Sequence, residues 1–216
     1  MSFLPINPQE MRERGWEQPD FICVTGDAYV DHPSFGIAII SRLLEREGYR
    51  CVILAQPDFT STRDFTAFGR PRLGFLITGG NIDSMVAHYT AAKKRRSDDA
   101  YTPGNKAGKR PDRACTVYSR LARQAYPDIP IILGGLEASL RRFAHYDYWE
   151  DKVRRSILLD AQADLLTYGM GERATRQLAA LLAAGTPAAE ITAVKGTCFL
   201  TKDPSVCAFP AVTVAS

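Results

Sequence analysis

Five short, uninterrupted apolar runs constrain the fold of this chain more than any other feature. They occupy residues 21–25, 51–55, 73–77, 130–133 and 164–168 of the 216-residue sequence. Between them lie segments with apolar residues at helical spacing, such as Ile37, Ile40 and Leu44. A strand that is apolar at every position is buried on both faces, which is typical of a parallel sheet covered by helices. The alternation therefore predicts an α/β protein.

The simplest arrangement of these segments is a flavodoxin-like, doubly wound sheet of five parallel strands, with a basic insertion after the third strand. We expect helices over 36–47, near 84–94, over 114–125 with Asp112 as its cap, in part of 137–160, and just before Gly185. Residues 1–19 are expected to form an N-terminal arm, and 20–190 the α/β domain, with its insertion at 81–112. Residues 191–216 are expected to form a tail, either a hairpin or an extended link.

Composition excludes several classes of protein. With 45% hydrophobic and 24% charged residues, the chain is neither disordered nor of low complexity. No apolar run approaches the roughly 18 residues of a membrane span, and the N-terminus lacks the features of a signal peptide. We therefore expect a cytoplasmic protein with its cysteines reduced. Cys23 and Cys51 are expected to pack as small hydrophobes. No metal site is expected; the alternative is a metal ion that Cys198 and Cys207 share.

Positive charge is concentrated in the predicted insertion. Residues 81–113 contain eight Lys or Arg against four Asp, whereas the whole chain has a net charge of only +3. The excess has two interpretations that the sequence leaves open. One is a solvated surface loop, and the other is a surface that binds phosphate groups or RNA.

Glycine and acidic residues follow four of the predicted strands. Ligands of doubly wound sheets bind beyond the carboxyl ends of the strands, and glycine lets the backbone approach a ligand closely. Four such turns together favour a planar ligand or an opposing domain, although glycines also serve as simple turns and the carboxylates as helix caps. The candidate binding residues are Asp27, Asp31, Gly79, Gly80, Gly134, Gly135, Glu137, Gly169, Gly171 and Glu172.

A dense group of aromatic and basic residues follows the fourth strand. Arg141, Arg142 and His145 are candidates to hold an anionic group while the neighbouring Tyr146, Tyr148 and Trp149 stack on a base or ring. The alternative is that this group packs a helix against the sheet or against another domain. His88 is expected to be structural, and no catalytic residue is assigned.

The turns do not match several known users of the fold. The third strand lacks the terminal aspartate of a phospho-receiver domain, and the first turn lacks the G-x-G-x-x-G of a dinucleotide site. The layout resembles the cobalamin-binding-type domain that precedes many radical SAM enzymes. In that domain the first loop reads Asp-x-His-x-x-Gly where histidine ligates cobalt, but this chain has Pro33 at the histidine position and His32 one residue earlier. We therefore expect weak or no cobalamin binding.

Longer motifs resemble the YgiQ family of radical SAM proteins. They include Asp-Asp-Ala-Tyr-Thr-Pro-Gly at 98–104, Ala-Gly-Lys-Arg-Pro-Asp-Arg-Ala at 107–114 and Gly-Gly-Leu-Glu-Ala-Ser-Leu-Arg-Arg at 134–142. The resemblance implies that this chain is the N-terminal part of a longer protein. It also implies a following radical SAM domain that holds a 4Fe-4S cluster and S-adenosylmethionine. The C-x-x-x-C-x-x-C motif of that domain is absent here, so no cofactor is expected in this chain.

Three functions remain open at this point. The chain could cover the radical SAM barrel and help to bind substrate or cofactor, with that C-terminal domain as its partner. It could instead bind RNA through the basic insertion, or it could only buttress the barrel. Glycine turns filled by the protein's own side chains would favour the last of these.

Overall fold

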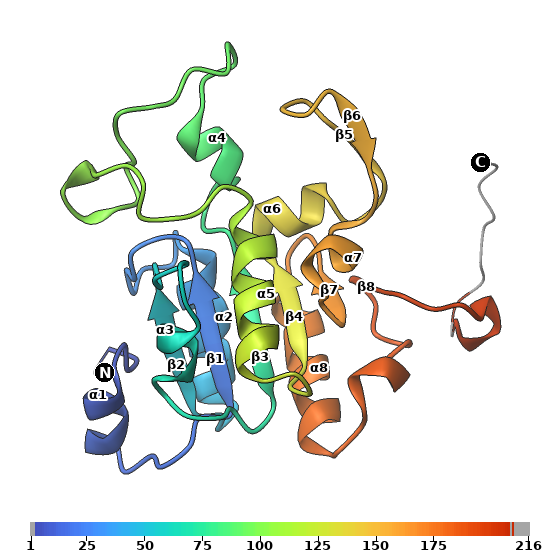
Figure 1. Ribbon diagram of the computed structural model, residues 1–216. Coiled ribbons are helices and arrows are strands. Elements are labelled where there is room, and N and C mark those ends of the chain that lie inside the picture. The colour runs from blue at the N-terminus through green and yellow to red at the C-terminus, as the bar shows by residue number, and fades with distance from the viewer. Residues whose placement is uncertain (1–2, 208, 210–216) are drawn as a thin grey trace.

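Six strands form one sheet in the order β2-β1-β3-β4-β7-β8 (Figure 1). The structure is a computed structural model that describes residues 3–207 and 209. The strands are β1 (Phe21–Thr25), β2 (Cys51–Ala55), β3 (Gly74–Thr78), β4 (Ile131–Gly134), β7 (Leu165–Thr167) and β8 (Thr197–Phe199). The first five pair in parallel, which confirms the predicted doubly wound sheet. The predicted number of strands was wrong, because β8 from the tail adds an antiparallel sixth strand beside β7.

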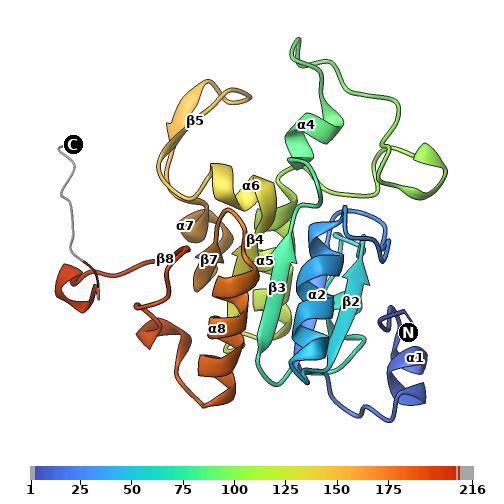
Figure 2. The ribbon, with the colours of Figure 1, turned by 180° about the vertical axis from the view of Figure 1, so that it is seen from behind.

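Helices cover both faces of this sheet. The face seen in Figure 1 carries α3 (Arg63–Thr66), α5 (Ala114–Ala125) and α7 (Ile157–Ala161). The opposite face carries α2 (Gly36–Arg46) and α8 (Glu172–Ala183), which lie on either side of β3 in Figure 2. Every residue of β1 is buried, because its alternate side chains enter the two cores on the two faces. The apolar runs of the sequence are thus explained by burial on both sides.

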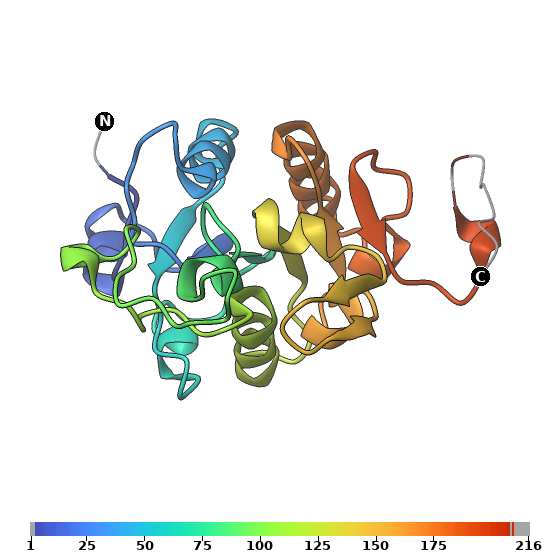
Figure 3. The same ribbon diagram turned by 90° about the horizontal axis from the view of Figure 1, so that it is seen from above.

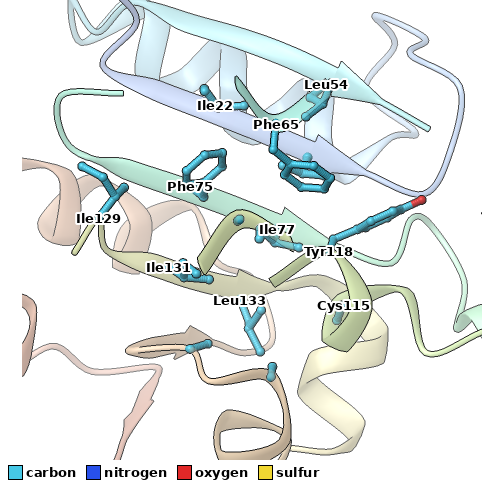
Figure 4. Close-up of a cluster of buried hydrophobic side chains, with 14 of the residues drawn as sticks. Ile22, Leu54, Phe65, Phe75, Ile77, Cys115, Tyr118, Ile129, Ile131 and Leu133 are labelled. Carbon is cyan, nitrogen blue, oxygen red and sulfur yellow. The ribbon is translucent and has the colours of Figure 1, made fainter. Parts of the chain in front are cut away.

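The larger core lies between the sheet and the helices α3, α5 and α7. Figure 4 shows Phe75, Ile77 and Ile131 from the strands pointing toward Phe65 and Tyr118 from the helices. The smaller core, on the α2 and α8 face, takes in the free, fully buried Cys23 and Cys51. Among residues 3–207 and 209, no helix is both long and apolar enough to cross a bilayer.

Several segments depart from the expected secondary structure. The helix expected near 84–94 is a single short turn, α4 (Ser84–His88), because the chain becomes extended at Tyr89. Residues 135–161 form α6 (Gly135–Leu140), a hairpin of β5 (His145–Asp147) and β6 (Lys152–Arg154), and then α7. Three short 3-10 turns lie at Pro103–Asn105, Ala188–Glu190 and Pro204–Val206. Within the tail, residues 208 and 210–216 lie outside the described residues.

The N-terminal segment is packed against the sheet instead of extending from it. It contains α1 (Pro8–Glu13), whose first turn is capped by the Asn7 side chain. Leu4 is fully buried, and the Pro5 carbonyl accepts a hydrogen bond of 2.8 Å from the Ile53 amide in β2. The segment therefore covers the outer edge of β2, which would otherwise expose unpaired backbone groups.

The buried hydroxyl of Tyr118 supports a prediction about stability. This side chain is fully buried, its hydroxyl has no hydrogen-bond partner among the described residues, and burial raises the pKa of its phenol. Because an unpaired buried hydroxyl is destabilising, Tyr118→Phe is expected to raise the free energy of unfolding by about 1 kcal/mol. Tyr118→Ala, which leaves a cavity, should lower it by about 3–5 kcal/mol. Urea denaturation measures both, and a clear loss of stability in the phenylalanine variant would contradict the assignment.

Candidate functional site

The ends of the central strands are level with one another. Thr25 of β1 is in register with Thr78 of β3, and Thr78 is in register with Gly134 of β4. Leu133 of β4 pairs with Leu166 of β7, so that Thr167 reaches the same level. The turns that follow β1, β3, β4 and β7 therefore all lie at the carboxyl edge of the sheet, which is at the top in Figure 1.

A cavity of about 320 Å³ opens at this edge, between the beginnings of α2 and α8. Its floor is apolar, with Leu76 and Ile132 from the strands and Ile37 from α2. Most of the residues that the sequence singled out at the turns contribute to its lining. Those lining residues are Asp27, Gly80, Gly134, Gly135, Gly169, Gly171 and Glu172.

Polar groups surround the mouth of the cavity. The helices α2 and α8 begin here, and neither Phe35 nor Gly171, at their N-cap positions, caps the first turn with its own side chain. The Gly36 amide at the start of α2 donates a hydrogen bond of 3.4 Å to Oδ1 of Asn81. Their first backbone N–H groups lack intrahelical partners, and the helix dipole makes this end positive. Threonine hydroxyls add further donors and acceptors. The lining threonines are Thr25, Thr78, Thr167 and Thr175. The arrangement suits a ligand with an apolar part and several hydrogen-bonding oxygen atoms.

The glycines at this edge have two different roles. A Cβ atom at Gly79 would collide with the Glu137 carboxylate, and one at Gly80 would collide with Asp27. These two glycines of the β3 turn are therefore required by packing within the chain. In contrast, a Cβ at Gly169 would meet no atom within 4 Å. The β3 turn is filled by the protein's own side chains, whereas the β7 turn is open.

Asp27 belongs to a buried cluster of charges. Its side chain is 1% exposed, and Arg110 from the insertion lies 2.9 Å away. Arg110 also donates two hydrogen bonds of 2.9 Å to Asp99 and one of 3.0 Å to the Gly79 carbonyl. Burial raises the pKa of Asp27, against the opposing effects of the Asn81 amide and Arg110. These contacts connect the insertion, through Arg110, to the turn that follows β1.

Glu137 lies beneath the β3 turn and caps two helices. The residue is 1% exposed, and its two carboxylate oxygens accept hydrogen bonds from Ser84 N at 2.9 Å and from Cys115 N at 2.8 Å. These amides belong to the first turns of α4 and α5. The sequence suggested that Glu137 caps its own helix as an alternative to binding a ligand. In the structure it caps α4 and α5 instead.

Four other candidate residues do not line the cavity. Asp31 is paired with Arg42, and the hydrogen bonds from Arg42 lower the pKa of Asp31. Arg141 is paired with Asp83. The remaining two have contacts close in sequence, and the Arg142 guanidinium also lies 5.1 Å from the ring centre of Tyr168. Arg142 donates to the Ser139 carbonyl at 2.6 Å, and the Nδ1 atom of His145 lies 3.1 Å from the Phe143 carbonyl oxygen.

Asp112 does not cap α5, contrary to the sequence-based expectation. The N-cap position is Arg113, which has a left-handed backbone conformation (φ 53°). Asp112 instead lies 2.5 Å from Nδ1 of His88 and accepts a hydrogen bond of 2.7 Å from the Tyr89 hydroxyl. These contacts link the two ends of the insertion, and they hold the pKa of Asp112 below its ordinary value in spite of partial burial.

Comparison with known families identifies the chain. The family model described as "Radical SAM N-terminal" matches residues 3–215. The chain belongs to the Radical SAM N-terminal family. This match confirms the resemblance to radical SAM proteins that the sequence motifs indicate.

Curated relatives of this Radical SAM N-terminal domain are UPF0313 proteins. One from Pseudomonas aeruginosa is 60% identical over 201 residues, which cover 93% of this chain and 27% of that protein. Others from Shewanella oneidensis and Geobacter sulfurreducens are each 57% identical, and the aligned parts cover 94% and 91% of this chain and 26% and 33% of those proteins. The chain thus spans between a quarter and a third of the length of these relatives.

A solved structure shares the fold. It is the radical S-adenosylmethionine methyltransferase TsrM from Kitasatospora setae, with tryptophan substrate and a SAM analog bound. The similarity has a TM-score of 0.52 at 18% sequence identity and covers 85% of this chain and 29% of TsrM. At this identity the comparison supports the fold and nothing further.

The first loop of this Radical SAM N-terminal domain departs from the cobalt-ligating pattern Asp-x-His-x-x-Gly. In the first loop, Pro33 offers no donor, and Nδ1 of the exposed His32 accepts a hydrogen bond of 3.1 Å from the Ser34 amide. A cubane cluster needs several adjacent thiolates. Within residues 3–207 and 209, however, no three His, Cys, Asp or Glu side chains are grouped as metal ligands would be.

Sequence reasoning missed two components of the site. Arg110 lies in a run of charged residues, and nothing local distinguishes it from its exposed neighbours. The lining threonines had a visible signal, because Thr25, Thr78 and Thr167 each end or nearly end an apolar run. A polar residue at that position of a parallel strand is well placed to face a ligand.

Proposed function

We propose that this chain is the N-terminal domain of a radical SAM iron–sulfur protein, in which it covers the radical SAM domain and contributes its cavity to the binding of substrate or cofactor. The observation that carries the proposal is the cavity at the carboxyl edge, where an open glycine turn, the N-terminal ends of α2 and α8 and threonine hydroxyls come together. The 4Fe-4S cluster and S-adenosylmethionine belong, in this proposal, to the following domain.

Exposed apolar side chains around the cavity mouth support a covering role. Met170 is 89% exposed, and Leu136 and Ile39, which also line the cavity, are 46% and 37% exposed. Leu140 and Phe143 lie exposed at the end of α6 and just beyond it. Apolar side chains grouped around an opening mark a surface that another domain or a ligand covers. The UPF0313 relatives are about three to four times as long as the part that aligns with this chain, so they have room for such a domain.

A substitution at Gly171 tests the role of the cavity. The backbone there has φ −78°, and an added Cβ would make only ordinary contacts, at 3.5 Å with Thr167 and 3.7 Å with Thr175. Gly171→Trp is therefore expected to preserve the fold while its ring occupies the mouth of the cavity. We expect that the full-length protein, purified without oxygen, retains a small molecule that mass spectrometry detects after denaturation, and that the Gly171→Trp variant loses it.

The control is Ala183→Trp, which places the same ring at the exposed far end of α8. This variant should retain the small molecule, and both variants should show the circular dichroism of the parent protein. A small molecule that Gly171→Trp retains, or a parent protein that carries none, would contradict the proposed role of the cavity.

A further inference from the structure

Four consecutive cationic residues form an exposed turn at the tip of the insertion. We call Lys93, Lys94, Arg95 and Arg96 the basic turn; all four are exposed. Among the described residues, no carboxylate lies within 4.0 Å of any of these four cations, whereas Arg42 and Arg154 each pair with two or more. The basic turn therefore has no close counter-charge within the described part of the chain.

Three acidic residues near the basic turn have partners outside it. Glu150 lies in the loop between β5 and β6, and its ion-pair partners are Arg113, Lys152 and Arg154. Asp112 is bonded to His88 and Tyr89, and the charge of Arg95 in the basic turn also helps to lower its pKa. Asp99 is paired with the buried Arg110. Glu150 and Asp99 are thus paired with other cations, and Asp112 is a single carboxylate against the four cations of the basic turn, so a net positive potential is left available to a partner.

The basic turn is held in one conformation by backbone contacts. Tyr89 and Arg95 form an isolated antiparallel bridge, and Lys93 reverses the chain with φ 57°. The Arg96 amide donates a hydrogen bond of 2.7 Å to the His88 carbonyl. The cations are thus presented at the end of an anchored loop, and less conformational entropy is lost when they bind than in a free chain.

Aromatic rings from the β5–β6 hairpin lie against the basic turn. The ammonium group of Lys93 is 4.8 Å from the ring centre of Tyr148 and donates to the Trp149 carbonyl at 3.3 Å. The Tyr148 hydroxyl donates to the Ala91 carbonyl at 2.7 Å, and Trp149 packs on Tyr89 with ring centres 5.0 Å apart. Tyr148 is nevertheless 49% exposed. Both segments stand above the carboxyl edge of the sheet (Figures 1 and 3).

We propose that the basic turn and the ring of Tyr148 together bind single-stranded nucleic acid. The four cations neutralise successive phosphates, and the exposed ring stacks on an unpaired base. A duplex keeps its bases stacked inside, so it would use the cations alone and lose the contribution of the ring. This surface does not include residues that line the cavity, so the proposal is independent of the proposed function.

Fluorescence anisotropy with labelled single strands of about 20 nucleotides tests the proposal. The 216-residue chain is suitable, because both faces of its sheet are covered within the chain. We expect binding that weakens as potassium chloride rises, with a slope of log K against log salt near −3, since each of about four phosphates contributes about −0.7. RNA and DNA strands form separate arms that identify the natural class of ligand.

Two variants locate the binding surface. Replacing all four residues of the basic turn with glutamine should weaken binding at least about tenfold and bring the salt slope close to zero. Tyr148→Leu should weaken it about tenfold with little change in slope, because stacking carries no charge. The matched control is the quadruple glutamine variant of four exposed cations elsewhere, Arg12, Arg46, Arg173 and Lys195, which removes the same charge.

Three results would overturn the proposal. The first is an equal loss of affinity in the control, which would mean that net charge alone drives binding. The second is affinity for a duplex, or for vesicles of anionic lipid, that equals the affinity for single strands. The third is an absence of binding at about 50 mM salt, where such contacts are strong.

Discussion

Replacement of Arg110 by alanine is expected to lower the free energy of unfolding by about 3–5 kcal/mol. The guanidinium is fully buried and contacts two carboxylates, those of Asp27 and Asp99, which are 1% and 4% exposed as residues. Without Arg110, both negative charges and the Gly79 carbonyl oxygen would lose this partner. A buried charge without a partner is far more destabilising than an exposed one.

Thermal unfolding measures this effect, with an expected fall in melting temperature of about 10 °C for a chain of this size. Arg70→Ala serves as the control, because it breaks an Arg–Asp pair with Asp128 that is exposed on both sides, and little change is expected. The triple variant Asp27→Asn, Asp99→Asn, Arg110→Met removes all three charges and should recover most of the loss. An Arg110→Ala protein as stable as the parent would refute the assigned role of the cluster.

The pH dependence of the Arg110→Ala variant distinguishes an electrostatic cause from lost packing. Burial already raises the pKa of Asp27 in the parent chain, so its folded state binds a proton more readily than its unfolded state. Such a group favours folding at acid pH, and this contribution is lost as pH rises through the folded pKa. Removal of Arg110 takes away a charge that lowers the pKa of Asp27, so this pKa should rise further in the folded variant. The loss in free energy of unfolding caused by Arg110→Ala should therefore be larger at about pH 8 than at about pH 5. A defect independent of pH would indicate lost packing instead.

Replacement of Glu137 by alanine is expected to cost about 3–5 kcal/mol in the free energy of unfolding. Its two carboxylate oxygens are the hydrogen-bond acceptors for the buried amides of Ser84 and Cys115. Alanine would leave both amides without these bonds and would also open a cavity beneath Gly79. The same change should loosen α4, which joins the insertion to the sheet.

Hydrogen exchange provides the specific measurement for Glu137. The amides of Ser84 and Cys115 should exchange faster in Glu137→Ala, and Glu137→Gln should protect only one of them, because a carboxamide has a single acceptor oxygen. Glu190→Gln, at an exposed position, is the control with the same change of charge. Unchanged exchange at both amides in the alanine variant would show that other groups cap α4 and α5.

These two carboxylates explain why the β3 turn contains glycine. Asp27 and Glu137 occupy the space next to Gly80 and Gly79, and each is bonded to a segment far away in the sequence. The turn is therefore a junction that holds the insertion against the sheet. The open part of the edge is the β7 turn, where Gly169 and Gly171 line the cavity.

Local patterns in the sequence determined the five parallel strands, the three long helices α2, α5 and α8, and the family. Runs such as 21–25 and 51–55 are apolar at every position because the strand is buried on both faces, and that property is visible without knowledge of neighbours. Helical spacing likewise reports one buried face. The alignment of the strand ends at one edge then follows from parallel pairing.

Only the tertiary structure decided which of the candidate residues face a ligand and which are used internally. Arg110 is paired with Asp27, 83 positions before it, and Glu137 binds amides 53 and 22 positions away. The antiparallel strand β8, the role of Asp112 and the contact between the basic turn and the hairpin depend in the same way on distant partners. Periodicity reports only whether a position is buried, whereas charge pairing and capping depend on which segments the folded sheet brings together.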